Sequence, residues 1–296
     1  MGFYETGGAA GRSGDFLTSP EVGPLFGAVL ARALDAWWSE LGEPDPFTVV
    51  EAGAGRGTLA KAVMAAGPAC GPVLRYVAVE RSKALRSLNP ASVATMPDEP
   101  FTGVIVANEL LDNLPFGLLE RTADGWAEVR VDGELREVLV PAAGDLDAPV
   151  GARIPVQRAA GEWVERARRL ADRVVAVDYA DTTASMAHRP WTDWVRTYRR
   201  HGRGGHPLAD LGHQDITCEV AVDQLPPTTS DRSQAQFLRD FGIEELAAEA
   251  AQAWRERAHI GDLQALVSRS RVHEAAALTD ETGLGAFRVL EWAQGV

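Results

Sequence analysis

The chain has 296 residues, enough for one large α/β domain or two smaller ones, and 46% of them are hydrophobic, as in an ordinary globular core. Its formal net charge of −13 argues against non-specific nucleic-acid binding, which requires a basic surface. No stretch reaches the ~18 apolar residues of a membrane span. The only cysteines, Cys70 and Cys218, lack metal-ligand spacing. We therefore expect a protein in a reducing cytoplasm, without a disulfide framework, a metal or a membrane span.

The first predicted helix follows a glycine-rich segment. Residues 19–21 (Ser-Pro-Glu) supply an N-cap, a proline at the first helical position and an acid in the first turn. Apolar residues then keep helical spacing up to Trp37, and the helix should end near Gly42. Just before the helix stand two polar residues that either serve helix entry or belong to a lid over a cofactor site, Asp15 and Thr18.

The central motif of the sequence lies between residues 49 and 59, where an apolar run is followed by an acid and three alternate glycines. This pattern predicts a strand, a tight turn and a helix start, with backbone N–H groups facing a ligand. A second predicted strand, residues 73–80, ends in an acid about twenty residues beyond the glycines, where βαβ folds bind ribose hydroxyls. The alternative is that this acid only ends a strand at the surface. The predicted cofactor-binding residues are Glu51, Gly53, Gly55, Gly57, Thr58 and Glu80, together with Asp15 and Thr18 from the segment before the first helix.

The glycine spacing distinguishes two kinds of nucleotide cofactor. A dinucleotide site has G-x-G-x-x-G, whereas here the glycines are at 53, 55 and 57 and position 58 is threonine. Together with Glu51, this spacing is similar to the acidic-x-G-x-G-x-G pattern of class I methyltransferases. We therefore favour S-adenosylmethionine over a nicotinamide cofactor.

A third predicted strand, residues 101–107, has polar side chains at its carboxyl end, where open α/β sheets bind ligands. Transfer of a methyl group by in-line displacement needs a positioned acceptor and suitable charge around it. The predicted catalytic residues are Asn108, Glu109 and Asp112. The alternative interpretation makes residues 112 and 113 a turn before Pro115.

The remaining sequence predicts additions to this core. Strand-like runs in residues 118–140 indicate a hairpin or meander, and a helix over 158–173 leads to a strand at 174–179. Residues 181–225 suit an inserted substrate-recognition segment, or else a solvated helix face with two buried tryptophans. Three helix-like runs cover 233–241, 244–257 and 262–270, and a last strand is expected at 286–292. We expect a single domain over residues 1–296 with two insertions.

Several motifs resemble the MidA family of S-adenosylmethionine-dependent methyltransferases, whose mitochondrial members act in respiratory complex I assembly. The similar segments are residues 14–21, 51–59, 108–115, 196–201, 212–217 and 287–290, so the likeness spans nearly the whole chain. One departure is the first segment: Gly2-Phe3-Tyr4 stands almost at residue 1, where relatives have a longer segment leading to Gly-Tyr-Tyr.

The resemblance implies a Rossmann-like class I methyltransferase fold that binds S-adenosylmethionine, with a protein arginine as the acceptor in mitochondrial relatives. It also implies substrate roles for Tyr198, His201, Gln214 and Asp215. A guanidinium needs carboxylates around it, and Glu109 with Asp112 could form such a clamp. The same carboxylates could bind a small-molecule amine or hydroxyl, and a non-catalytic assembly factor that keeps the fold is a further alternative.

Overall fold

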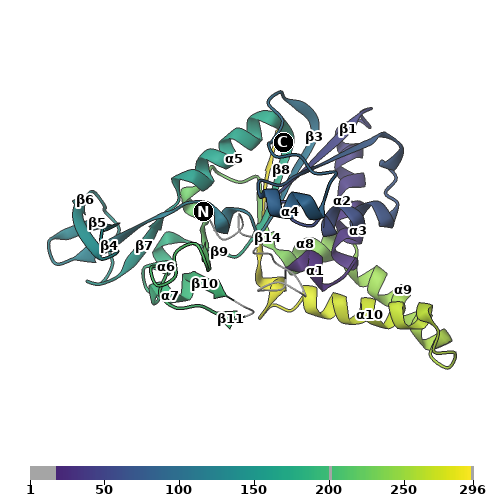
Figure 1. The fold of residues 1–296 in the computed structure, drawn as a ribbon. Coiled ribbons are helices and arrows are strands. Elements are labelled where there is room, and N and C mark those ends of the chain that lie inside the picture. Colours follow the sequence, from purple (N-terminus) through teal and green to yellow (C-terminus); the bar gives the residue numbers. More distant parts are fainter. Residues whose placement is uncertain (1–17, 200–201, 295–296) are drawn as a thin grey trace.

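A computed structural model describes residues 18–199 and 202–294, and a six-stranded sheet forms its centre (Figure 1). The strand order is β14-β15-β8-β3-β1-β2. The last four of these strands run parallel, whereas β15 is antiparallel to both of its neighbours. The strands are β1 (Phe47–Ala52), β2 (Leu74–Val79), β3 (Phe101–Asn108), β8 (Ala171–Asp178), β14 (Ser230–Ser233) and β15 (Arg288–Ala293).

Helices cover both faces of this sheet because its central strands are apolar on both sides. Val49 and Val104 face a cluster with helices α2, α3, α8, α9 and α10, whereas Val50 and Ile105 face the opposite cluster with α5. This arrangement confirms the predicted α/β, Rossmann-like class. The helices are α1 (Ser19–Val22), α2 (Leu25–Glu40), α3 (Thr58–Ala66), α4 (Lys83–Leu88), α5 (Arg158–Leu170), α8 (Gln234–Asp240), α9 (Ile243–Arg257) and α10 (Leu263–Leu278).

The prediction of one continuous helix from Ser19 was wrong, because the chain breaks at Gly23 between α1 and α2. Pro24 disfavours a helical conformation of the residue before it. The buried carboxylate of Glu274 then accepts the backbone N–H of Leu25 at 3.0 Å. A Cβ on Gly23 would lie 2.2 Å from Cδ of Glu274, so the carboxylate fits only beside glycine. The N-cap of α1 is Thr18 rather than Ser19.

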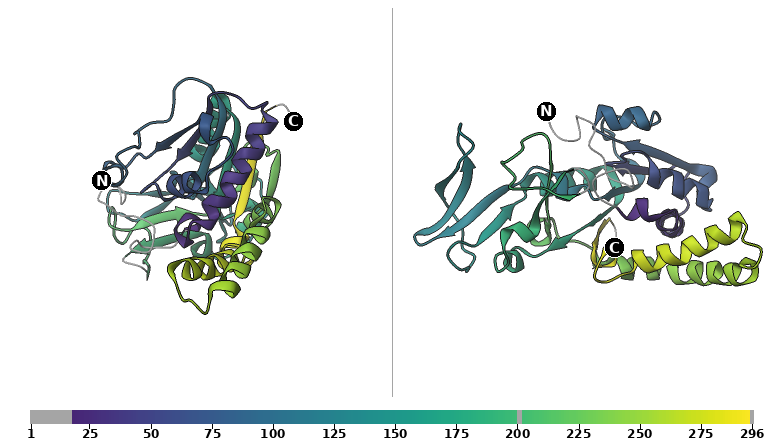
Figure 2. Two further views of the ribbon diagram at one scale, coloured as in Figure 1. Left: turned by 90° about the vertical axis from the view of Figure 1, so that its right-hand side faces the viewer. Right: turned by 60° about the horizontal axis from the view of Figure 1, so that its bottom comes forward.

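A second sheet extends beyond the predicted 118–140 hairpin and projects from the core (Figures 1 and 2). Its order is β6-β5-β4-β7, and the last strand returns from beyond residue 150 to pair with β4. Arg153 of β7 reinforces this pairing through ion pairs with Glu120 and Glu137. The strands are β4 (Gly117–Thr122), β5 (Gly125–Val131), β6 (Glu137–Ala142) and β7 (Arg153–Val156).

The segment predicted as the 181–225 insertion contains short helices and strands instead of one solvated helix. Its three-stranded sheet has the order β11-β10-β12, and the two-stranded sheet joins β13 to β9. Trp194 is buried in a small cluster of its own, with Met186 and Cys218. The elements are β9 (Ala180–Asp181), α6 (Thr183–Met186), α7 (Trp191–Trp194), β10 (Val195–Arg199), β11 (Gly202–Arg203), β12 (Asp215–Cys218) and β13 (Val220–Ala221).

Two absences concern only the part of the chain that the structure describes. Among those residues, no helix combines the length and the apolar character needed to cross a bilayer. The same residues contain no group of three histidine, cysteine or acidic side chains arranged to hold a metal ion.

Candidate active site

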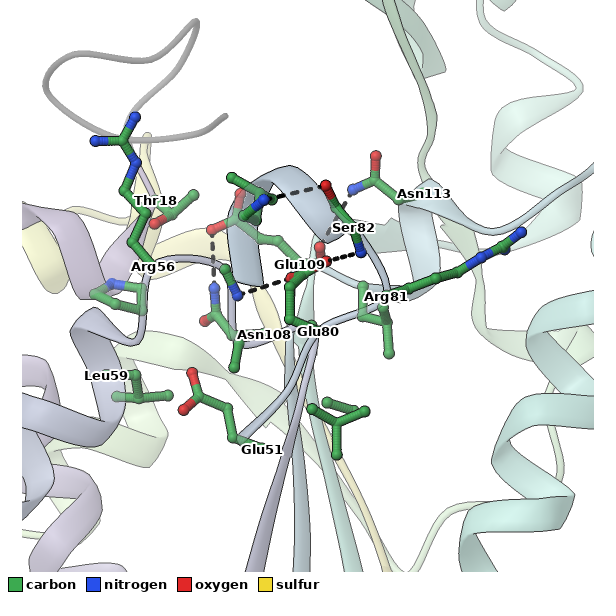
Figure 3. Close-up of a pocket in the computed structure, with 18 of the residues that line it drawn as sticks. Thr18, Glu51, Arg56, Leu59, Glu80, Arg81, Ser82, Asn108, Glu109 and Asn113 are labelled. Atoms are coloured by element: carbon green, nitrogen blue, oxygen red, sulfur yellow. Dashed lines mark hydrogen bonds between the residues drawn. The ribbon is translucent and has the colours of Figure 1, made fainter. Parts of the chain in front are cut away.

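A cavity of about 670 Å³ opens at the carboxyl ends of β1, β2 and β3 (Figure 3). The chain passes from β1 to β2 on one side and to β3 on the other, so the cavity lies where strand order reverses, the usual ligand site of open α/β sheets. The structure thus brings together most of the predicted cofactor and catalytic residues. Those that line the cavity are Thr18, Glu51, Gly53, Gly55, Thr58, Glu80, Asn108 and Glu109.

The glycine turn has the conformation that its sequence predicts. Gly53, Gly55 and Gly57 have φ values of 76°, 51° and 74°, in the left-handed region that favours glycine. Gly57 does not line the cavity but precedes the first residue of α3, and a Cβ there would lie 2.6 Å from Nδ2 of Asn89. The turn is therefore fixed both by its glycines and by the packing behind it.

Glu80 joins the two walls of the cavity. One carboxylate oxygen accepts the N–H of Gly55 at 2.9 Å, and the other accepts the N–H of Ser82 at 2.7 Å. Each carboxylate oxygen has two lone pairs, so both can accept a further hydrogen bond from a ligand hydroxyl. Glu80 thus fixes the glycine turn, and its role in binding a ribose diol stays a prediction with which these contacts are compatible.

Glu51 is a buried carboxylate at the base of the cavity, with 5% of its surface exposed. The hydroxyl of Tyr76 donates a hydrogen bond to its Oε2 at 3.0 Å. Burial raises the pKa of Glu51 to about 7, although the bond from Tyr76 opposes this shift. A cationic group in the cavity would favour the charged carboxylate, which makes Glu51 suited to an ammonium or sulfonium ligand.

On the other side of the cavity, Glu109 follows β3 in a left-handed conformation, with a φ of 50°. Such a conformation is strained for a non-glycine residue and is often found at functional sites. Asn108 donates to Oε1 of Glu109 at 3.1 Å, and the hydroxyl of Tyr179 donates to Oε2 at 3.3 Å. Desolvation nevertheless raises the pKa of Glu109 to about 7.

Asp112 lies behind Glu109 and does not line the cavity, with 1% of its surface exposed. Asp178 at the end of β8 accepts the N–H groups of Leu111 and Asp112, which fixes the short 3-10 helix Leu111–Asn113. Asp112 is thus part of a turn, as in the alternative interpretation. It also belongs to a set of neighbouring carboxyls, Glu109, Asp112, Asp178 and Asp215, which we call the acidic group. Burial and then mutual repulsion raise the pKa of Asp112 well above its usual value, and burial likewise raises the pKa of Asp178.

Because the pKa values of Glu51 and Glu109 are raised in the folded chain, we expect the free energy of unfolding to depend on pH. Glu51 and Glu109 bind protons more tightly in the folded than in the unfolded chain, so their stabilising contribution is complete at low pH and is lost as pH rises through 7. Between pH 6 and pH 8, we expect the free energy of unfolding of the cofactor-free protein to fall by about 1 kcal/mol for each glutamate. Denaturant unfolding at both pH values measures this, and Glu51→Gln should show a smaller fall. An equal fall in wild type and variant would contradict the assignment to Glu51.

Three of the residues predicted to bind substrate lie in the described part of the chain, and none of the three lines the cavity. Asp215 is buried, and its strand β12 packs against the 3-10 helix that carries Asp112. Gln214 braces a loop, since its amide donates to the carbonyls of His206 and Pro207 at 3.0 Å each. Tyr198 of β10 is the strand partner of Asp215 of β12. Two further predicted residues, Asp15 and His201, lie outside the described residues.

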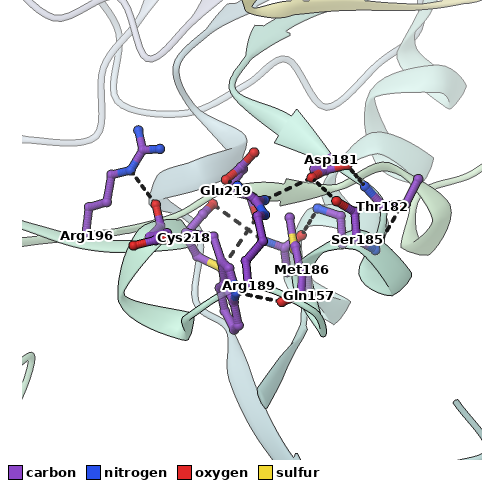
Figure 4. A network of polar contacts seen from close by, with 12 residues as sticks. Gln157, Asp181, Thr182, Ser185, Met186, Arg189, Arg196, Cys218 and Glu219 are labelled. Atoms are coloured by element: carbon purple, nitrogen blue, oxygen red, sulfur yellow. Dashed lines mark hydrogen bonds and ion pairs between the residues drawn. The ribbon is translucent and has the colours of Figure 1, made fainter. Parts of the chain in front are cut away.

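An ion-pair network holds this inserted segment together (Figure 4). Arg189 bridges Asp181 and Glu219 at 2.9 and 3.1 Å. Arg196 lies over the ring of Tyr179, with its Cζ 5.4 Å from the ring centroid. A guanidinium of the chain itself therefore already stacks on the tyrosine that donates a hydrogen bond to Glu109.

Several residues of the cavity wall were not predicted. Arg81 and Ser82 follow Glu80 directly, so their position at the carboxyl end of the second strand could have identified them as cavity residues. The α5 residues Trp163 and Arg166 gave no such signal, because helical periodicity shows only which face of a helix is buried. The other unpredicted lining residues include Arg56, Leu85, Met96, Leu110, Asn113 and Leu114.

The residues present fit a nucleoside-containing methyl donor. Glu80 is available to hydroxyls, Glu51 to a cation, and the glycine turn leaves room for close approach of a ligand. Oδ1 of Asn108 is buried and has no hydrogen-bond partner among the described residues, which leaves an acceptor for a ligand donor. This fold and this cavity define the chain as a Rossmann-like S-adenosylmethionine-dependent methyltransferase.

Comparisons with known proteins agree with this class. The chain belongs to the family described as "Putative S-adenosyl-L-methionine-dependent methyltransferase", whose model matches residues 29–239. It is 27% identical to the mitochondrial protein arginine methyltransferase NDUFAF7 of Mus musculus and 26% identical to that of Homo sapiens, covering 82% of this chain and 67% of each relative. A crystal structure of a Burkholderia thailandensis protein bound to S-adenosyl-homocysteine is 28% identical, with a TM-score of 0.80 over 99% of this chain and 84% of that one.

Proposed function

We propose that the chain transfers the methyl group of S-adenosylmethionine to an arginine side chain of a protein. The observation that carries this proposal is a group of four carboxyls: Glu109 lines the cofactor cavity, and Asp112, Asp178 and Asp215 are buried. In residues 18–199 and 202–294, no salt bridge involves the first three of them. Clustered buried carboxyls without paired cations are costly, and an incoming guanidinium would offset that cost.

The geometry of the group suits a planar cation. Oδ1 of Asp112 accepts the amide of Asn113 at 2.7 Å, whereas its buried Oδ2 has no hydrogen-bond partner among the described residues. The hydroxyl of Tyr179 has one hydrogen and donates it to Glu109. A guanidinium has five N–H donors in a fixed plane and can therefore bond to Glu109 while it stacks on an aromatic ring.

The residues of the chain would act mainly by position and charge. S-adenosylmethionine, when bound, supplies an electrophilic methyl carbon on its sulfonium. Glu109 would hold one nitrogen of the acceptor toward the cavity, so that this nitrogen attacks the methyl carbon as the carbon–sulfur bond breaks. The methylated nitrogen then gives up a proton. Glu109, with its pKa raised to about 7, is placed to accept it.

The names of the mitochondrial relatives also support an arginine acceptor. The experiment that tests it incubates purified protein with radiolabelled S-adenosylmethionine and a lysate of cells that lack the gene, followed by acid hydrolysis and amino-acid analysis. We expect label in methylarginine from the protein fraction. Label only in metabolites would instead identify a small-molecule methyltransferase. No label above that of a protein-free control would identify a non-catalytic assembly factor.

A further inference from the structure

Helices α9 and α10 form a hairpin that projects from the body of the molecule, away from the β4–β7 sheet (Figures 1 and 2). The base of the hairpin belongs to the core, since Ile243, Ala275 and Leu278 are buried against the central sheet cluster. The opposite end, around residues 258–267, contributes nothing to that cluster. The hairpin is therefore anchored at one end and free at the other.

The free end carries an apolar tip, which we define as Ile260, Leu263, Leu266 and Val267. Their exposed fractions are 54%, 77%, 54% and 44%, and the value for Leu263 is the highest of the exposed large hydrophobic residues in the described chain. The last three are spaced i, i+3 and i+4 on α10 and so share one face of the helix. Such a contiguous apolar surface at a protruding end indicates an interaction site.

Exposed arginines surround this tip. Arg255 lies on α9, and Arg269 and Arg271 lie one helical turn beyond Leu266 and Val267 on α10. A turn rises about 5.4 Å, so the positive charges form a collar just behind the apolar residues. Residues 254–273 contain four arginines and two acids, although the whole chain has a net charge of −13. Arg257 pairs with one of those acids, Asp262.

We propose that the apolar tip enters the interfacial region of an anionic lipid bilayer while the arginine collar contacts the lipid headgroups. Interfacial segments bury apolar side chains roughly 5–10 Å below the headgroups, and arginines near the surface strengthen binding to anionic lipids. This spacing matches the single turn between the tip and the collar. A second copy of the chain is a poorer occupant, because two such tips would bring like charges together.

The collar acts over a short range, so the negative charge on the rest of the chain does not prevent this binding. At physiological ionic strength, charges separated by more than about 8 Å of solvent are largely screened. The hairpin holds the tip away from the acidic body (Figure 2). Membrane docking would thus be local and would depend on salt concentration.

Vesicle co-sedimentation of the full chain tests the proposal, with phosphatidylcholine vesicles that contain or lack phosphatidylglycerol. The wild type should bind the anionic vesicles and lose this binding at high salt. The double variant Arg269→Gln/Arg271→Gln should bind about 30-fold more weakly, and Leu263→Ser/Leu266→Ser should also lose most binding. A matched control is Val138→Ser/Leu139→Ser on β6, where both residues are 43% exposed; this variant should bind as the wild type does.

Circular dichroism and S-adenosyl-homocysteine binding verify that each variant is folded, because the hairpin tip lies outside the cofactor cavity. Equal binding to neutral and anionic vesicles would overturn the proposal, as would a loss in the β6 control equal to that in the tip variants. Absence of vesicle binding by the wild type would also overturn it. So would a dimer in light scattering that the Leu263→Ser/Leu266→Ser variant abolishes, which would assign the tip to a protein interface.

Discussion

Replacing Glu109 with glutamine should lower kcat for methyl transfer about 100-fold and leave the affinity for S-adenosyl-homocysteine nearly unchanged. Glutamine keeps the shape of the side chain, but it can neither balance the charge of a guanidinium nor accept a proton. The amide oxygen can keep the hydrogen bond from Asn108, which is 3.1 Å long to Oε1 of Glu109, and the amide NH2 can donate to the hydroxyl oxygen of Tyr179, which lies 3.3 Å from Oε2. Steady-state kinetics with the identified acceptor, together with calorimetry, measure the two effects separately.

The matched control is Glu244→Gln, on the exposed surface of α9, which should retain the wild-type kcat. A Glu109→Gln enzyme with the wild-type kcat would remove Glu109 from the mechanism. Loss of cofactor affinity without a change in kcat would assign Glu109 to cofactor binding instead.

Glu80→Ala should weaken S-adenosyl-homocysteine binding by about 10- to 100-fold, because charge-assisted hydrogen bonds of roughly 1.5–3 kcal/mol are lost. The structure adds a second reason for this effect. Glu80 accepts the N–H groups of Gly55 and Ser82, so alanine also releases the glycine turn from the opposite wall. The turn would then have to be ordered at the expense of binding energy.

Calorimetric titration of S-adenosyl-homocysteine into the wild type and the Glu80→Ala variant measures this loss. Glu249→Ala, an exposed site on α9, serves as the control and should bind with wild-type affinity. If the Glu80→Ala variant bound S-adenosyl-homocysteine as tightly as the wild type, Glu80 would have no role in cofactor binding. The alternative interpretation, that this acid only ends a strand, would then hold.

The parts of the fold that could be predicted depend on local sequence. The glycine turn, the two strands around it and the acid at residue 80 lie within about thirty residues, and their conformations follow from glycine, β-branched residues and spacing. The break between α1 and α2 could be suspected from Pro24, but its stabilisation comes from Glu274, 249 residues away from Leu25. The return of β7 onto β4 is likewise a pairing between distant segments.

The site shows the same division. Asn108 and Glu109 were predicted because polar residues at a strand end are a local signal, and both line the cavity. The burial of Asp112 could not be predicted, since it depends on β8 and β12, which supply Asp178 and Asp215. The place of Trp163 in the cavity wall could not be predicted, because helix periodicity identifies a buried face but does not distinguish core from cavity.

We infer that one cavity holds the methyl donor between Glu80 on one side and, on the other, Glu109 with the carboxyls of Asp112, Asp178 and Asp215 behind it. A crystal structure with S-adenosyl-homocysteine tests it most directly. We predict ribose hydroxyls within hydrogen-bond distance of Glu80, the amino group of the ligand toward Glu51, and its sulfur nearer to Glu109 than to Trp163. A ligand with its sulfur toward α5, or bound outside this cavity, would contradict the account.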